Sequence, residues 1–575
     1  MSTPELFELH VRRDGRWGIE ETSKSEAEAI ETAKRKIRLP DIDGVRVVRE
    51  GDNRFGRLSV NTVFSQEKPR GEGGNVVVGR IDRAPACEER DALYGVPARQ
   101  TMARLFKGYL AKLVVTPTEV MHNAREMKRV MDRDTLVSTA IGRVANLQTA
   151  GDQAAAKGRR DTLTGFVDEI ATRARDVEKV TLPSIARLGP DGLAEDVAAK
   201  AKSNAEADYL LRVAISRDLV NERTWFGKLD STVGWATSSA QAKPIAALDD
   251  FIADTLNDAT LVQDLLGPQP DLVSALKSLL DLIEGKPPTQ RAKPDTALGE
   301  VGATAEKLGA LFEQGKLPGA RAILLDRVRS ELAGPNALTR GPATDEGNAL
   351  HDLALRVVPV ARDLVGGPDM AEALVERQSR IANRGGAAGR RDAVEAICRL
   401  LADPARQVRF VVAIRDSSTG PAVAETVDEI LDRLIGNATD LTTLTPKANA
   451  DSERLSTAAG IFYQLDRSRL EPNRRDGLTR HIDQLLLRHI RDTNLIARLD
   501  APDRPLRERA ELLISLCLPE ILPPGEAAMA TRQIIVDYLR QPSFEEKVVA
   551  DLADPVAKAN ALRRLFDLMR RAGFR

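Results

Sequence analysis

The chain has 575 residues, of which 42% are hydrophobic and 29% are charged, and its formal net charge is −1 at pH 7. This even balance provides no overall field that would draw the protein to DNA or to an anionic membrane. Aromatic residues make up only 4%, which favours helices packed through Ala and Leu over platforms that stack nucleic-acid bases. A chain of this length is expected to form roughly two to four domains.

The cysteines and the hydropathy pattern indicate the compartment. Cys87, Cys398 and Cys517 lie far apart, which argues against disulfides and zinc and favours a reducing environment. No stretch reaches the roughly 18 apolar residues that a membrane helix needs, and the N-terminus lacks the features of a signal peptide. We therefore expect a cytoplasmic protein without a membrane span. The preference for Ala, Arg, Asp and Gly is typical of a GC-rich bacterial genome.

The first 66 residues predict a small α/β domain. Apolar and polar residues alternate on both sides of an Asp-Gly pair, which is the pattern of a β-hairpin. An amphipathic helix and two further strands follow, giving the order ββαββ. The expected elements are strands at 7–11 and 17–19, a helix over 27–37, and strands at 45–48 and 58–64.

Beyond this head the pattern is helical, interrupted by Gly and Pro. The predicted fold class is α+β overall: a small N-terminal ββαββ domain followed by a predominantly all-α region of divergent tandem helical repeats. Even the β-branched run 408–414 is expected to be helical, because its neighbours are. The predicted parts are a head at 1–66, a linker at 67–97, helical repeat 1 at 98–285, a linker at 286–295, helical repeat 2 at 296–460 and a shortened helical repeat 3 at 461–575.

Three similar stretches are the basis for the repeats. Each is an apolar helix end with a proline (Pro183, Pro359 or Pro519), followed by a Gly/Pro turn and an Ala-rich helix start. A second pair of prolines, Pro244 and Pro421, has nearly the same offset as the first two. The alternative is that Ala-rich and Leu-rich helices ending in Gly-Pro resemble one another by chance. Matching structure in the three copies would distinguish the two explanations.

An arginine-rich segment at 377–415 is the candidate anion-binding site. Residues 389–392 are expected to begin a helix whose free N–H groups hold an anion, with Arg390 and Arg391 as clamps. The alternative is a turn between helices with solvated arginines whose stems cover apolar surface. The candidate residues are Arg384, Gly386, Gly389, Arg390 and Arg391. The other arginines of the segment are Arg377, Arg380, Arg399, Arg406, Arg409 and Arg415.

Trp225, Phe226 and Trp235 are the candidate partner-binding residues, because tryptophans often anchor interfaces. They are expected in a Gly/Ser/Thr-rich interruption between helices, and the alternative is that they fill a gap in the helical stack. Among the five histidines only His481 and His489 are close, and their spacing of about two helical turns does not suit shared metal coordination. The sequence therefore predicts no metal site, no cofactor and no catalytic residue.

These features favour a cytoplasmic, non-enzymatic scaffold or regulatory adaptor that presents helical surfaces to protein partners. A second hypothesis is a module that binds a phosphorylated ligand or RNA through the arginines of 377–415, with nucleic acid the less favoured partner. A third is an enzyme whose site is assembled between repeats from scattered Asp, Glu and Arg, which would require a deep pocket with perturbed carboxylates. Whether the chain is an enzyme, and its oligomeric state, remain open at this point.

Overall fold

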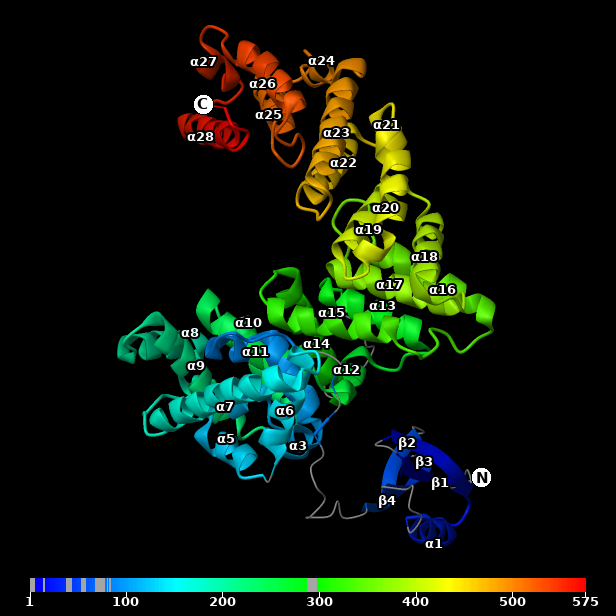
Figure 1. Ribbon diagram of the computed structural model, residues 1–575. Coiled ribbons are helices and arrows are strands. Elements are labelled where there is room, and N and C mark those ends of the chain that lie inside the picture. Colours follow the sequence, from blue (N-terminus) through cyan, green and yellow to red (C-terminus); the bar gives the residue numbers. More distant parts are fainter. Residues whose placement is uncertain are drawn as a thin grey trace. The chain divides into compact units, whose positions relative to one another are not determined.

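The computed structural model describes residues 6–13, 16–37, 44–52, 58–67, 78–79, 81, 84–133, 135–286 and 297–574. The chain divides into two compact units, Met1–Val77 and Val78–Arg575. The first contains a four-stranded sheet with one helix, and the second is helical (Figure 1). The predicted fold class, a small ββαββ domain followed by a predominantly all-α region, is confirmed.

The head is an antiparallel sheet with the strand order β2-β1-β3-β4. Its helix packs against β1 and β3, so that every second residue of β1, beginning at Phe7, is buried beneath it. The helix begins after Ser25, whose hydroxyl accepts from the N–H of Glu28 at 3.4 Å. The elements are β1 (Leu6–Arg13), β2 (Arg16–Ser23), α1 (Glu26–Lys36), β3 (Gly44–Asp52) and β4 (Leu58–Glu67).

The second unit opens with a series of helices, of which α7 is the longest. Most begin at a Ser, Thr, Asn or Asp that accepts from a backbone N–H of the first turn, or at a proline in the first positions. In chain order they are η1 (Arg90–Tyr94), α2 (Val96–Leu105), α3 (Lys107–Leu113), α4 (Pro117–His122), α5 (Ala124–Met131), α6 (Leu136–Gln148), α7 (Gln153–Asp176), α8 (Ile185–Lys200), α9 (Asn204–Leu219), α10 (Trp225–Ser238), α11 (Ala242–Thr255), α12 (Ala259–Leu266) and α13 (Leu272–Ile283).

The helices continue without strands through the rest of the described chain. The run at 408–414 is helical, as expected, and lies in α19. The remaining elements are α14 (Ala297–Glu313), α15 (Pro318–Ala333), α16 (Ala343–Val357), α17 (Gly367–Ile381), α18 (Gly386–Leu401), α19 (Pro404–Asp416), η2 (Gly420–Val423), α20 (Ala424–Leu431), η3 (Asp432–Gly436), α21 (Leu441–Leu444), α22 (Asp451–Asp466), α23 (Pro472–Asp492), α24 (Leu495–Leu499), α25 (Leu506–Leu516), α26 (Glu526–Leu539), α27 (Phe544–Val548) and α28 (Pro555–Arg571).

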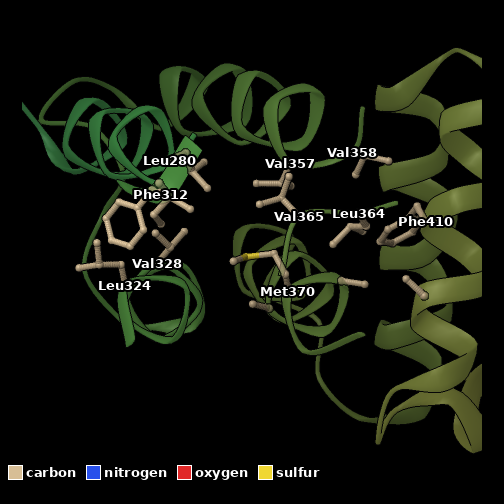
Figure 2. Close-up of a cluster of buried hydrophobic side chains, with 14 of the residues drawn as sticks. Leu280, Phe312, Leu324, Val328, Val357, Val358, Leu364, Val365, Met370 and Phe410 are labelled. Carbon is tan, nitrogen blue, oxygen red and sulfur yellow. The ribbon is translucent and has the colours of Figure 1, made fainter. Parts of the chain in front are cut away.

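The hydrophobic core of this unit is formed by helices that pack one on the next along the chain. α9 packs on α11, α11 on α15, α15 on α17, α17 on α19, and α19 on α22. Their buried faces join in one apolar cluster that extends from Ile185 to Ala528. Figure 2 shows a section of this cluster, where Phe312 and Leu324 lie on one side and Phe410 on the other. The final helices, α25–α28, have an apolar cluster of their own.

Arginines connect successive helices by donating to carbonyl groups at the ends of earlier ones. Arg377 donates from Nε to the carbonyl of Leu332 at 2.7 Å, and Arg406 donates from Nη1 to the carbonyl of Val358 at 2.7 Å. The carbonyls of Leu332 and Val358 lie at the C-terminal ends of α15 and α16, where the helix supplies no N–H partner, so a neighbouring guanidinium satisfies them. Six arginines make these contacts at sequence separations of 41–51 residues: Arg377, Arg380, Arg406, Arg409, Arg474 and Arg488.

Aspartates make the complementary connection at helix N-termini. Asp249 of α11 accepts from the N–H groups of Gly319 and Ala320 at 2.6 and 2.8 Å, at the start of α15. Asp483 of α23 accepts in the same way from Glu526 at 2.6 Å, at the start of α26. A carboxylate is favourable there because the first N–H groups are unpaired and the helix dipole is positive.

Pro183, Pro359 and Pro519 occupy similar places: each lies in the connection that precedes a helix, namely α8, α17 and α26. The three copies at 98–285, 296–460 and 461–575 remain a prediction within the helical unit. The predicted linker at 286–295 lies outside the described residues except for Lys286, and so does much of 67–97, including 68–77.

Candidate functional site

A groove of about 650 Å³ runs along α15 and α17, and α2 and the turn before η2 also border it. It follows the succession of packed helices described above, so its walls come from segments far apart in the sequence. We call it the α15–α17 groove. Its charged and polar lining residues are Arg104, Arg329, Ser330, Asp369, Glu372, Glu376 and Ser418.

The two arginines of the groove are held by a single carboxylate. Asp326 of α15 accepts from Arg104 Nη2 at 2.7 Å and from Arg329 Nε at 3.0 Å. The Arg104 side chain is 40% exposed and that of Asp326 is 22% exposed. One carboxylate thus contacts two guanidinium groups on this wall.

The opposite wall carries a row of carboxylates on α17. Asp369, Glu372 and Glu376 are spaced i, i+3 and i+7, which places them on one face of the helix. Glu372 Oε1 accepts from Ser418 Oγ at 2.6 Å and from Thr419 Oγ1 at 2.7 Å. These bonds fix the Glu372 carboxylate and join the turn after α19 to α17.

The groove therefore has a row of acidic groups facing a pair of partly neutralised arginines. Such an arrangement can bind a polypeptide segment whose basic side chains lie along α17 and whose carbonyl or carboxylate groups meet the arginines. Sequence analysis did not identify it. The i, i+3, i+7 spacing of acidic residues was visible in the sequence, but the partners from α2 and α15 were not.

Much of the arginine-rich segment is used inside the fold. Arg377 and Arg409 are 2% and 0% exposed, and both donate to backbone carbonyls. Arg409 also pairs with Asp363 at 3.0 Å. Arg380 and Arg406 contact carbonyls as well. These four arginines therefore connect helices.

Four of the five predicted anion-binding residues lie in the first turns of α18, and the fifth, Arg384, precedes this helix by two residues. This helix begins at Gly386, one turn earlier than the expected start at Gly389. Gly389 is buried, and a Cβ there would lie 2.5 Å from the carbonyl oxygen of Arg384, so this position requires glycine. Arg384 pairs with Asp392 at 2.7 Å. Arg390 and Arg391 are exposed in the second turn.

The expected interruption around Trp225, Phe226 and Trp235 is wrong, because all three lie on α10. Thr224 Oγ1 accepts from the N–H of Gly227 at 3.0 Å and begins the helix, a capping signal that outweighs the Gly, Ser and Thr content. All three aromatic side chains are partly buried and pack against the main apolar cluster.

A buried polar cluster between α2, α4, α10 and α11 also escaped sequence analysis. Arg99 Nε donates to Asp254 at 2.9 Å, and Asp254 accepts from the backbone and hydroxyl groups of Thr118 at 2.8 and 2.7 Å. Lys228 pairs with Glu119, and both side chains are at most 1% exposed. The Thr-x-x-Glu spacing that starts α4 was a readable capping signal, whereas the partners lie more than 100 residues away.

His122 lies beside this cluster. Its Nδ1 donates to the carbonyl of Thr118 at 2.8 Å, and its ring contacts those of Tyr94 and Tyr209, with ring centres 5.2 and 4.8 Å away. Complete burial lowers the pKa of His122 to about 3, so the ring is neutral at physiological pH. These groups hold helices together, and neither they nor the buried carboxylates line the α15–α17 groove.

The three cysteines are buried free thiols. Burial raises the pKa of Cys398 and of Cys517 to about 12, which disfavours the reactive thiolate. Among the described residues, no group of three or more His, Cys, Asp and Glu side chains is placed to hold a metal ion. In the same part of the chain, none of the helices combines the length and hydropathy required to cross a bilayer.

Comparisons with protein-family models, with curated proteins and with solved structures found no match for this chain.

Proposed function

We propose that this chain is a scaffold or regulatory adaptor whose packed helices present surfaces to protein partners, with the α15–α17 groove as the main contact site. The observation that carries the proposal is the groove itself: three carboxylates on one face of α17 opposite two arginines that share Asp326. Stacked helices are suited to this task because each added helix extends the same surface.

The charges of the groove indicate the chemistry of the partner. A segment with Lys or Arg side chains at intervals that match Asp369, Glu372 and Glu376 would pair with the acidic row. Paired charges across an interface mainly set specificity and association rate. Binding should therefore weaken as the salt concentration rises.

Charge reversal in the groove tests the proposal. The double variant Asp369→Arg with Glu376→Arg should reduce recovery of the partner by about tenfold in affinity purification at modest salt. The matched control is Glu425→Arg with Glu429→Arg, which makes the same charge change on exposed positions of α20. Cross-linking mass spectrometry should place the partner on α15 and α17. Equal recovery with both double variants, or no partner with the native chain, would contradict the proposal.

A second candidate is the binding of a phosphorylated ligand or RNA at the start of α18. It is favoured by the exposure of Arg390 and Arg391, whose guanidinium groups have no hydrogen-bond partner among the described residues. Affinity for RNA or for inorganic phosphate should then fall steeply with salt and be lost with Arg390→Ala and Arg391→Ala together. Affinity that is insensitive to both changes would eliminate this candidate.

A further inference from the structure

A partly open cavity of about 140 Å³ lies in the first group of helices of the second unit, lined by α2, α4, α5, α6 and α7. Its walls are almost entirely apolar. They include three of the eight methionines of the chain, Met102, Met121 and Met127, together with Phe106 and Ala140. The cavity is separate from the α15–α17 groove, with which it shares no lining residue.

The few polar groups at the edge of the cavity are already engaged. Gln148 donates from its amide to the carbonyl of Pro85, and its Oε1 accepts from Arg159 Nε at 2.6 Å. Thr101 donates its hydroxyl to the carbonyl of Pro97 at 2.9 Å. An occupant that needed a hydrogen bond would find little to pair with.

This lack of polar partners also disfavours water. A bound water typically needs two to four hydrogen bonds, which this lining does not offer, whereas an apolar cavity of roughly 150 Å³ can accept a molecule the size of benzene. Methionine side chains are unbranched and polarizable, so they adapt to the shape of an apolar guest.

We propose that this cavity is a binding site for a small uncharged hydrocarbon group, aromatic or alkyl, of about the size of toluene. The site should favour ligands that are small enough to fit the cavity and that carry no polar atoms. The segment that carries Pro85 and Cys87 forms part of its wall, and it is held in place by Gln148 and by Arg159, which donates to the carbonyl of Cys87 at 2.6 Å.

The methionines provide a direct test on the full chain. With methyl-¹³C methionine, addition of toluene should shift the NMR signals of Met102, Met121 and Met127. The signals of Met370, which is buried elsewhere, and of Met529, which is 64% exposed, should not move. Phenol should bind on the order of tenfold more weakly than toluene, because its hydroxyl would lose its hydrogen bonds to water.

Filling the cavity provides the second arm. Ala140→Leu adds three carbons to the wall and should abolish the toluene-dependent shifts while the Met370 signal stays at its native position. If this variant does not fold, the titration of the native chain with toluene still tests the proposal through the methionine signals. The proposal is overturned if the three cavity methionines do not respond at the solubility limit of toluene, if all methionines respond alike, or if phenol binds as tightly as toluene.

Discussion

His122 shows how much a single buried side chain can contribute to the response of the protein to acid. Its ring is packed against Tyr94 and Tyr209, and the nearby cations Arg99, Arg173 and Arg212 oppose a further positive charge. In the unfolded chain a histidine titrates near 6.5. Because the pKa in the folded state is lowered to about 3, the unfolded state binds more protons between these values, and stability falls as the pH falls through that window.

We predict that His122→Gln flattens the dependence of stability on pH. In the native chain this group should cost about 2 kcal/mol of stability between pH 7 and pH 5, and glutamine, which does not titrate, should remove that loss. Denaturant unfolding at several pH values measures the effect. An unchanged slope in His122→Gln would contradict the structure.

The buried pair Lys228–Glu119 gives a second prediction. Lys228→Met leaves the carboxylate of Glu119 buried without its cation, which should destabilise the fold by about 3–5 kcal/mol. Adding Glu119→Gln should recover most of the lost stability, because the glutamine side chain is neutral and still accepts from the N–H of Thr116. The fluorescence of Trp225 and Trp235, on the same helix as Lys228, reports the unfolding.

The matched control for Lys228 is an exposed ion pair. Lys200 and Asp196 lie 2.6 Å apart on α8, with side chains 45% and 33% exposed. Lys200→Met should therefore change stability by less than about 1 kcal/mol. Equal effects of the two lysine substitutions would mean that Lys228 is not buried as described.

At the scale of the helix, the aspartates that cap a neighbouring N-terminus make a specific prediction. Asp483→Ala removes the acceptor for Glu526 and Ala527 at the start of α26 and should cost about 1–2 kcal/mol. Hydrogen–deuterium exchange should be faster in the first turns of α26. Asp492→Ala is the control, because Asp492 occupies an exposed position of α23, the helix that carries Asp483; it should not change exchange in α26. If the first turns of α26 remain protected in Asp483→Ala, the aspartate does not act as their cap.

Individual elements were largely predictable because their signals are local. The alternation from Phe7 to Val11 and the helical neighbours of 408–414 identified β1 and α19 correctly. The sequence signal for a helix was weaker at Trp225, where the Gly and Ser content suggested a break between helices. The helix forms there because Thr224 caps its N-terminus. Arg377 and Arg409 illustrate the limit: their acceptor carbonyls lie 41–49 residues away, and periodicity carries no information about such pairs.

At the scale of the whole molecule, a succession of helices that contact mainly their neighbours behaves as a nearly one-dimensional system, in which parts open separately. Helices α25–α28 have their own apolar cluster, which includes Leu565, a side chain that is 3% exposed. Leu565→Ala should cost this part about 2–5 kcal/mol and accelerate hydrogen exchange in α25–α28, with no change in α11 and α15.

Leu512→Ala is the control for this prediction, since Leu512 lies on α25 but is 37% exposed. It should have a much smaller effect on exchange. If Leu565→Ala accelerated exchange equally throughout the second unit, the helices would unfold as a single cooperative body and the picture of separable parts would be wrong.

The arginine contacts between successive helices have a practical consequence for dissecting the protein. A fragment that stops after α16 keeps the carbonyl groups of Leu355 and Val358 but loses Arg406, which donates to both. Its new end is then both apolar and short of hydrogen bonds, a combination that promotes association between fragments. Truncations that retain the next arginine-bearing helix should remain monodisperse more readily than those cut at the preceding loop.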